Sequence, residues 1–173
     1  VDTAGSVLQK LVDGGILLAL TTTIIGGMGG YLMRLGKTLT TGASQDGSLV
    51  ALAHECHLDG GAYSSFGIAT VYYAGSLLGG PYRLPNMKYD GYRVVTNKPA
   101  CGAHRGHGGV AARACWEQQL DMIAEELNMD PLDFRLMNMM ETGDVSCNDL
   151  SMSSFGMREC IEAIKEGSDW KSK

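Results

Sequence analysis

The sequence predicts an α+β fold, in which an antiparallel, hairpin-rich sheet packs against helices. Alternating apolar and polar residues lie on either side of an Asp-Gly turn at residues 46–47, and a second alternating run covers residues 87–96. Residues 110–127 instead carry an apolar stripe with helical spacing. A period of two is typical of strands, and a period of 3.6 is typical of helices. With 173 residues, of which 45% are hydrophobic, the chain can form a packed core as one domain or as one lobe of a larger protein.

The first half of the chain is predicted to form most of the sheet. The β-branched run Thr21 to Ile25 is typical of a buried strand, and it ends in a glycine-rich segment at residues 26–30. That segment suits either a phosphate-binding loop or a tight turn. From Leu32 to Leu58 the pattern predicts two antiparallel strands joined at Ser44 to Gly47, because Asp-Gly strongly favours hairpin turns.

A His-Glu-Cys-His cluster at residues 54–57 invites a metal-binding interpretation. Strand alternation, however, places His54 and Cys56 on one face of the sheet, and Glu55 and His57 on the other. No second cluster follows at zinc-finger spacing. We therefore expect structural histidines and a buried thiol.

The second half of the chain is predicted to be mainly helical. An apolar stretch of small residues predicts a buried helix from Ile68 to Leu78, with Tyr72 and Tyr73 as packing residues. Asp130 is expected to cap a short helix that begins at Pro131. Further expectations are a strand over 87–96, a long helix over 110–127, closure of the short helix at 143–144, a last helix over 155–166 and a frayed end over 169–173.

Charge and composition exclude several functions. The formal net charge is −5 and no Lys/Arg stripe is present, which argues against nucleic-acid binding. The apolar run over residues 16–25 is too short and too rich in threonine to span a membrane. Five cysteines form no disulfide framework, and no secretory leader precedes them, so we expect a soluble cytoplasmic protein.

The segment from Asn97 to Gly109 is the strongest candidate site. It joins a predicted strand to a predicted helix, and it combines six glycines or alanines with one guanidinium and two imidazoles. Glycines permit close backbone approach, and the free amides at a helix start favour anions. A metal held by Cys101, His104 and His107 is the competing hypothesis, but it needs a fourth ligand that the sequence does not identify.

Several motifs in order along the chain resemble those of one enzyme family. They are Gly-Gly-Ala-Tyr at 60–63, Tyr-Ala-Gly-Ser at 73–76, Asn-Lys-Pro at 97–99, Gly-Ala-His-Arg-Gly-His-Gly-Gly at 102–109, the Asn-Met-Asp-Pro segment that begins at 128, Asn138, and Gly-Asp at 143–144. This succession resembles the molybdenum-binding large subunits of the xanthine dehydrogenase and aldehyde oxidase family. The resemblance covers about Leu32 to Ile164. It implies that residues 31–173 form part of a molybdopterin-binding domain, and that residues 1–30 form a poorly matched N-terminal segment with a glycine-rich loop.

The resemblance implies roles for individual residues. Arg105 corresponds to the cofactor-side arginine, and Ala103 and Gly106 to backbone that the cofactor approaches. His107 replaces the aromatic residue that flanks the substrate, where Tyr63 or Phe66 can also shape the pocket; it either packs there or donates a proton. The expected cofactor-binding set is Gly102, Ala103, His104, Arg105, Gly106, Met28 and Gly29, and no residue of this chain is expected to ligate the metal.

His104 and His107 depart from the motif that is usual in the family. With these histidines the sequence most resembles the branch of 4-hydroxybenzoyl-CoA reductases, which remove an aromatic hydroxyl reductively. The alternatives are a molybdenum hydroxylase of aldehydes or N-heterocycles, and a noncatalytic truncated domain with a folding or interaction role. The resemblance implies that the cofactor is molybdopterin in its cytosine dinucleotide form. It implies as partners the rest of the large subunit and subunits or domains that carry iron–sulfur clusters and FAD. The implied substrate is a small aromatic molecule. Since the family's catalytic glutamate lies beyond Lys173, we expect no turnover by this chain alone.

Overall fold

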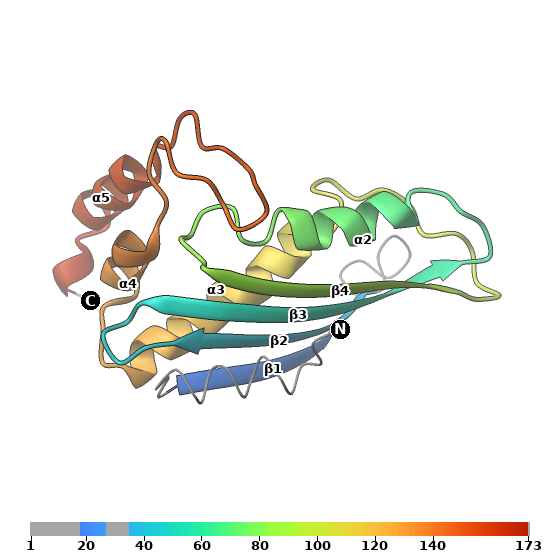
Figure 1. Ribbon diagram of the computed structural model, residues 1–173, viewed down its shortest axis with the longest axis horizontal. Coiled ribbons are helices and arrows are strands. Elements are labelled where there is room, and N and C mark those ends of the chain that lie inside the picture. Colours follow the sequence, from blue (N-terminus) through green and yellow to red (C-terminus); the bar gives the residue numbers. More distant parts are fainter. Residues whose placement is uncertain (1–17, 27–34, 173) are drawn as a thin grey trace.

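The computed structural model describes residues 18–26 and 35–172, with side chains from Thr38 onward. Four strands form one sheet in the order β1-β2-β3-β4. Figure 1 shows the long sheet with α2 and α3 packed beside it, and α4 and α5 grouped at one end. The elements are β1 (Leu18–Gly26), β2 (Leu35–Ala43), β3 (Leu49–Gly61), α2 (Gly67–Ser76), β4 (Asn86–Val95), α3 (Gly109–Glu126), α4 (Pro131–Asn138), α5 (Met157–Gly167) and the short 3-10 turn η1 (Trp170–Ser172).

The predicted hairpin is confirmed as the antiparallel pair β2 and β3. Its turn closes through the amide of Ser44, which donates to the Ser48 carbonyl over 2.9 Å, and Gly47 has a φ of +89°. A positive φ is readily available to glycine and costly for other residues, which explains the Asp-Gly signal. The alternation at residues 54–57 is also confirmed, because His54 and Cys56 are buried whereas Glu55 and His57 are exposed.

The expectation of an antiparallel sheet is only partly correct. β1, β2 and β3 are antiparallel neighbours, but β4 pairs with β3 in parallel, with His54 beside Tyr89. The chain between these two strands, residues 62–85, contains α2. A parallel pair needs such a crossover to bring the chain back to the same end of the sheet. The alternation within β4 predicts a strand but does not indicate its direction.

The core lies between the sheet and α3. Trp116, Leu120 and Ile123 on α3 are fully buried, as the apolar stripe predicts, and they pack in one cluster with residues of β2 and β3 such as Leu39 and Leu52. One polar residue also crosses this interface. The side chain of Gln119 accepts a hydrogen bond from the Thr41 hydroxyl over 2.5 Å and donates to the Leu39 carbonyl over 3.2 Å. These bonds fix α3 along β2.

The helix α2 is not the buried helix that the sequence predicts. Its small residues, including Thr70 and Ala74, are buried, whereas Ile68 is 67% exposed and Tyr72 is 64% exposed. The expectation that Tyr72 is a packing residue is therefore wrong. Small side chains let α2 approach β4 and α3 closely, so the large side chains point outward.

The C-terminal region is held by Asp130. Its carboxylate accepts from the amides of Leu132 and Asp133 at the start of α4, which confirms the predicted cap. It also accepts from the Trp170 indole over 2.6 Å, so residues 169–172 are pinned to α4 rather than frayed. The helix itself ends at Asn138, earlier than predicted, because Met139 is already extended. No helix in the described part is long and apolar enough to cross a membrane.

Candidate functional site

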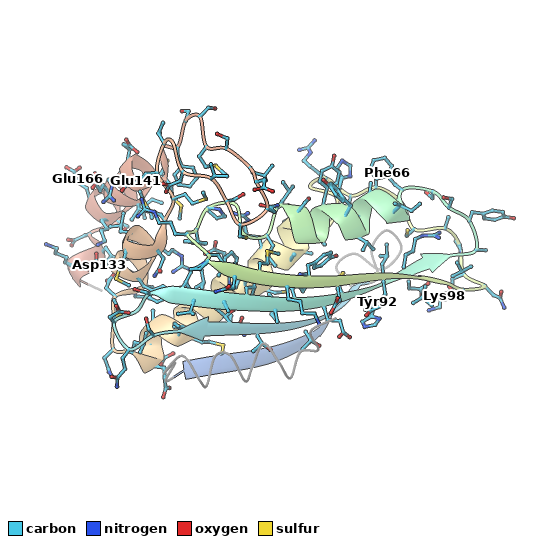
Figure 2. The ribbon with its side chains drawn as sticks, in the orientation of Figure 1. Phe66, Tyr92, Lys98, Asp133, Glu141 and Glu166 are labelled. Carbon is cyan, nitrogen blue, oxygen red and sulfur yellow. The ribbon has the colours of Figure 1, made fainter. Side chains whose placement is uncertain are left out.

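The candidate loop runs from Thr96 to Gly108 and is anchored on the end of β3. Asp59 provides the anchor, since its carboxylate accepts from the Thr96 hydroxyl over 2.6 Å and from the Lys98 ammonium over 2.7 Å. The amide of Cys101 donates to the Gly60 carbonyl over 3.2 Å. Figure 2 shows Lys98 near this end of the sheet. The first part of the loop is thereby fixed before the chain reaches Gly102.

A second cation lies beneath the same region. The guanidinium of Arg93 on β4 donates to the Tyr63 carbonyl over 2.5 Å. A Cβ at Gly60 or Gly67 would come within 2.6 to 2.7 Å of the Arg93 Nε, so these two glycines make room for the guanidinium. That Nε is buried and has no hydrogen-bond partner in the described part of the chain. No local pattern predicts this role, because Arg93 is simply one polar residue in an alternating strand.

The loop then forms a turn with an outward-facing guanidinium. The amide of His107 donates to the His104 carbonyl over 2.8 Å, and Gly106 has a φ of +88°. Ala103, His104 and Arg105 are exposed. Within residues 38–172, Arg105 forms no hydrogen bond or ion pair. Its charge is therefore available to an anionic ligand.

His107 turns the opposite way, toward α2. Its ring centroid lies 4.7 Å from that of Phe66 and 5.7 Å from that of Tyr73, and both pairs are tilted. Figure 2 shows Phe66 at the end of α2 where this helix begins. The Nδ1 of His107 is buried and has no partner among the described residues. The residue also has a φ of +45°, a left-handed conformation that is uncommon outside glycine. Phe66, Tyr73 and His107 thus form an aromatic wall, in which the Nδ1 of His107 has no hydrogen-bond partner among the described residues.

The next two glycines serve packing rather than ligand approach. Gly108 has a φ of +94°, and a Cβ there would lie 2.4 Å from the Thr70 carbonyl oxygen. A Cβ at Gly109 would lie 3.5 Å from the Tyr73 carbonyl. These two glycines therefore bring the start of α3 against α2. No side chain caps α3, and the Gly109 amide donates to the Gly106 carbonyl over 2.8 Å, so the amides that follow Gly109 leave a partial positive charge beside the loop.

The structure brings some predicted site residues together and separates others. Gly102 to Gly106 form one continuous surface, and His107 lies behind it. Cys101 is buried whereas His104 is exposed, and no group of three or more His, Cys, Asp or Glu suited to a metal occurs in the described part of the chain. Met28 and Gly29 lie outside the described residues.

These residues suit an anionic group. On this turn Arg105 is exposed and has no partner among the described residues, and the start of α3 that follows it has no side-chain cap, so both offer donors. Such donors match phosphate and similar oxygen-rich ligands. The expected fit of the loop to a phosphate-bearing cofactor therefore has a physical basis in this chain.

Comparison with known proteins gives a consistent result. Residues 14–139 match the family model described as molybdopterin cofactor-binding domain. The chain is 39% identical over 127 residues to the nicotinate dehydrogenase large molybdopterin subunit of Eubacterium barkeri, covering 73% of this chain and 30% of that subunit.

Solved structures share the fold. The aldehyde oxidoreductase from Desulfovibrio gigas matches with a TM-score of 0.72 and 30% identity, over 79% of this chain and 15% of that one. The quinoline 2-oxidoreductase from Pseudomonas putida 86 matches with a TM-score of 0.77 and 21% identity, over 82% of this chain and 19% of that one, which shows the fold alone. The chain spans less than a third of these relatives. It belongs to the family of molybdopterin cofactor-binding domains found in xanthine dehydrogenases and aldehyde oxidoreductases.

Proposed function

We propose that this chain forms one wall of the cofactor site in a molybdenum-dependent oxidoreductase. The observation that carries the proposal is Arg105, which is exposed and has no partner among the described residues, on the turn that precedes α3, a helix without a side-chain cap. Gly102, Ala103, His104 and Gly106 present the backbone of the same turn to the ligand. Met28 and Gly29 are proposed to contact the cofactor from the N-terminal segment.

In this proposal the chain contributes position and charge. When bound, the molybdenum–pterin group supplies the two-electron redox chemistry. Arg105 and the amides at the start of α3 hold its anionic part, and Asp59 keeps the loop in place through Thr96 and Lys98. We propose that the cofactor is the cytosine dinucleotide form and that the enzyme is located in the cytoplasm. We also propose that this chain works with the remainder of a large subunit and with iron–sulfur and FAD partners. The family's catalytic glutamate belongs to that remainder.

The substrate side is proposed to be the aromatic wall of His107, Phe66 and Tyr73. Relatives named as a nicotinate dehydrogenase subunit and an aldehyde oxidoreductase favour hydroxylation of an N-heterocycle or an aldehyde. The wall can stack a planar substrate. The Nδ1 of His107 is buried and has no partner among the described residues, so we propose that it forms a hydrogen bond with a ring nitrogen or a carbonyl of the substrate.

Reductive dehydroxylation of an aromatic acyl-CoA is the second candidate. It rests on the same imidazole, which can deliver a proton where a phenylalanine can only stack. The variant His107→Phe separates stacking from proton transfer, since it keeps a ring beside Phe66 and removes both nitrogens. We expect this variant to lower kcat and alter its pH profile if His107 handles a proton, and to raise KM alone if the imidazole only binds substrate. Assays with a heterocyclic acid, an aldehyde and an aromatic thioester then identify the reaction.

Cofactor content tests the main proposal directly. The chain, expressed with its native partners and the maturation machinery, is expected to copurify with molybdenum. Arg105→Ala should lower the molybdenum content, and Arg105→Lys should lower it less, because lysine keeps the charge but loses the guanidinium fork. Arg158→Ala is the matched control, since Arg158 is exposed on α5 and its contact to Glu141 is long, at 3.5 Å. Molybdenum absent from every preparation would instead favour a noncatalytic domain, and unchanged occupancy in Arg105→Ala would refute the role of Arg105.

A further inference from the structure

A separate pocket lies at the C-terminal end of α2. It has a volume of about 350 Å³ and is lined by Tyr72, Gly75, Ser76, Met87, Tyr89, Cys147 and Asn148. Figure 1 shows the loop that follows α4 reaching toward this end of α2. None of its lining residues belongs to the candidate cofactor loop, although that loop contacts the same helix at Thr70 and Tyr73. The pocket is therefore a separate feature of α2.

Two sulfur atoms face each other in this pocket. The Sγ of Cys147 lies 3.8 Å from the Sδ of Met87. A Cβ at Gly79 would lie 3.4 Å from the cysteine sulfur and 3.6 Å from the methionine sulfur, so the glycine leaves space beside the pair. One sulfur comes from β4 and the other from a loop about 60 residues later in the chain. Their meeting is a product of the tertiary fold.

The loop that carries Cys147 is held by its neighbours. Asn148 donates through Nδ2 to the Ser76 carbonyl over 2.7 Å, and its Oδ1 accepts from the Ser146 hydroxyl over 2.6 Å. The hydroxyl of Ser76 is buried and has no partner within the described residues. These bonds hold Cys147 beside Met87.

The separation of the sulfurs matches shared coordination of one ion. Two ligands at the usual metal–sulfur distance of about 2.3 Å, at an angle of about 110°, lie about 3.8 Å apart. Thiolate and thioether ligands together select soft ions, above all Cu(I). We propose that Cys147 and Met87 bind one soft monovalent cation, with Cu(I) as the best match.

The binding step needs no oxidant or reductant. The Cys147 thiol releases its proton to solvent as the copper–thiolate bond forms, and the Met87 sulfur donates a lone pair. Because binding releases this proton, affinity should rise with pH. The competing interpretation is a weak hydrogen bond from the Cys147 thiol to the Met87 sulfur, with no cation.

Competition with bicinchoninate, at buffered Cu(I) and without oxygen, tests the proposal on the whole chain. Wild type should bind one Cu(I) more than Cys147→Ser at the same free copper concentration. Met87→Leu conserves volume and removes the thioether. Because second-shell partners alone change metal affinity 10–100-fold, loss of this direct ligand should weaken binding at least about tenfold.

Cys160→Ser is the matched control, because Cys160 is an exposed thiol on α5. It should bind Cu(I) as wild type does. Equal binding by wild type and Cys147→Ser would overturn the proposal. So would equal binding by wild type and Met87→Leu, which would leave Cys147 as an ordinary thiol. The measurement needs no molybdenum, so its outcome is independent of the proposed cofactor site, and circular dichroism verifies that each variant is folded.

Discussion

The buried side chain of Asn138 joins the hairpin to α4, and its removal should destabilise the chain strongly. Its amide nitrogen donates to the Gly47 carbonyl over 2.9 Å and to the Phe134 carbonyl over 3.0 Å. Its amide oxygen accepts from the Leu49 amide over 2.8 Å. Asn138 is only 5% exposed, and Gly47 and Leu49 are also buried. Water therefore cannot readily replace these bonds.

Asn138→Leu keeps a similar volume and removes every side-chain bond. It leaves the Gly47 carbonyl and the Leu49 amide without partners, and each buried unsatisfied group costs about 1–3 kcal/mol. We expect a loss of roughly 2–5 kcal/mol in the free energy of unfolding, a large share of the 5–15 kcal/mol typical of a domain. Urea unfolding, followed by the fluorescence of Trp116 and Trp170, measures this loss; an unchanged m-value confirms that stability alone has changed.

Asn86→Leu is the matched control for this measurement. Asn86 is exposed and donates one hydrogen bond to the Val50 carbonyl over 3.0 Å, so its loss should cost less than about 1 kcal/mol. Asn138→Asp adds a second test, because its carboxylate can accept from Leu49 but cannot donate to Gly47 until it is protonated. Its stability relative to wild type should improve as the pH falls. A loss in Asn138→Leu no greater than that in Asn86→Leu would refute the reasoning.

Three further outcomes follow from the geometry. Asp130→Ala should lower the free energy of unfolding by about 0.5–2 kcal/mol, because the helix cap is lost, and it should release Trp170, seen as a shift in its fluorescence. Asp130→Asn should keep the cap. Equal losses of stability in the two variants would show that charge rather than capping matters. Partial burial opposes ionisation of Asp130, but hydrogen bonds from Trp170 and backbone amides lower its pKa. The stability that the ionised carboxylate adds to the folded chain should therefore be complete above about pH 4 and disappear at lower pH. The Asp130→Asn variant should lack this acid transition. Gly108→Ala should lower the free energy of unfolding by more than about 2 kcal/mol, since it adds a clash with Thr70 to left-handed backbone strain. In Gly143→Ala the new Cβ meets nothing within 4 Å, so only the backbone strain remains, at about 1–2 kcal/mol. Thermal unfolding that shows the larger loss in Gly143→Ala would contradict this.

Much of the fold follows from local signals. The Asp46-Gly47 turn, the alternation around His54, the α3 stripe around Trp116 and the Asp130 cap each depend on residues within a few positions of one another. Backbone conformation and side-chain period act over that same short range. These elements were accordingly predicted with nearly correct bounds.

The loop that carries the candidate site was predicted from the sequence, but its contacts were not. The run from Gly102 to Gly106 indicated an exposed loop before a helix, and the structure has that loop. The contact of His107 with Phe66 and Tyr73, and the place of Arg93 beneath Gly60, had no local signal. Each depends on how α2 crosses between β3 and β4.

The amino-acid sequence by itself determined the strands, the hairpin, the main helices and the exposed arginine loop, because turn chemistry and hydrophobic period are local properties. Tertiary structure alone decided that β4 runs parallel to β3, that Gly108 packs on α2, and that Cys147 meets Met87. These features join segments that are far apart along the chain. Their energies come from packing and hydrogen bonds that exist only once the crossover has folded.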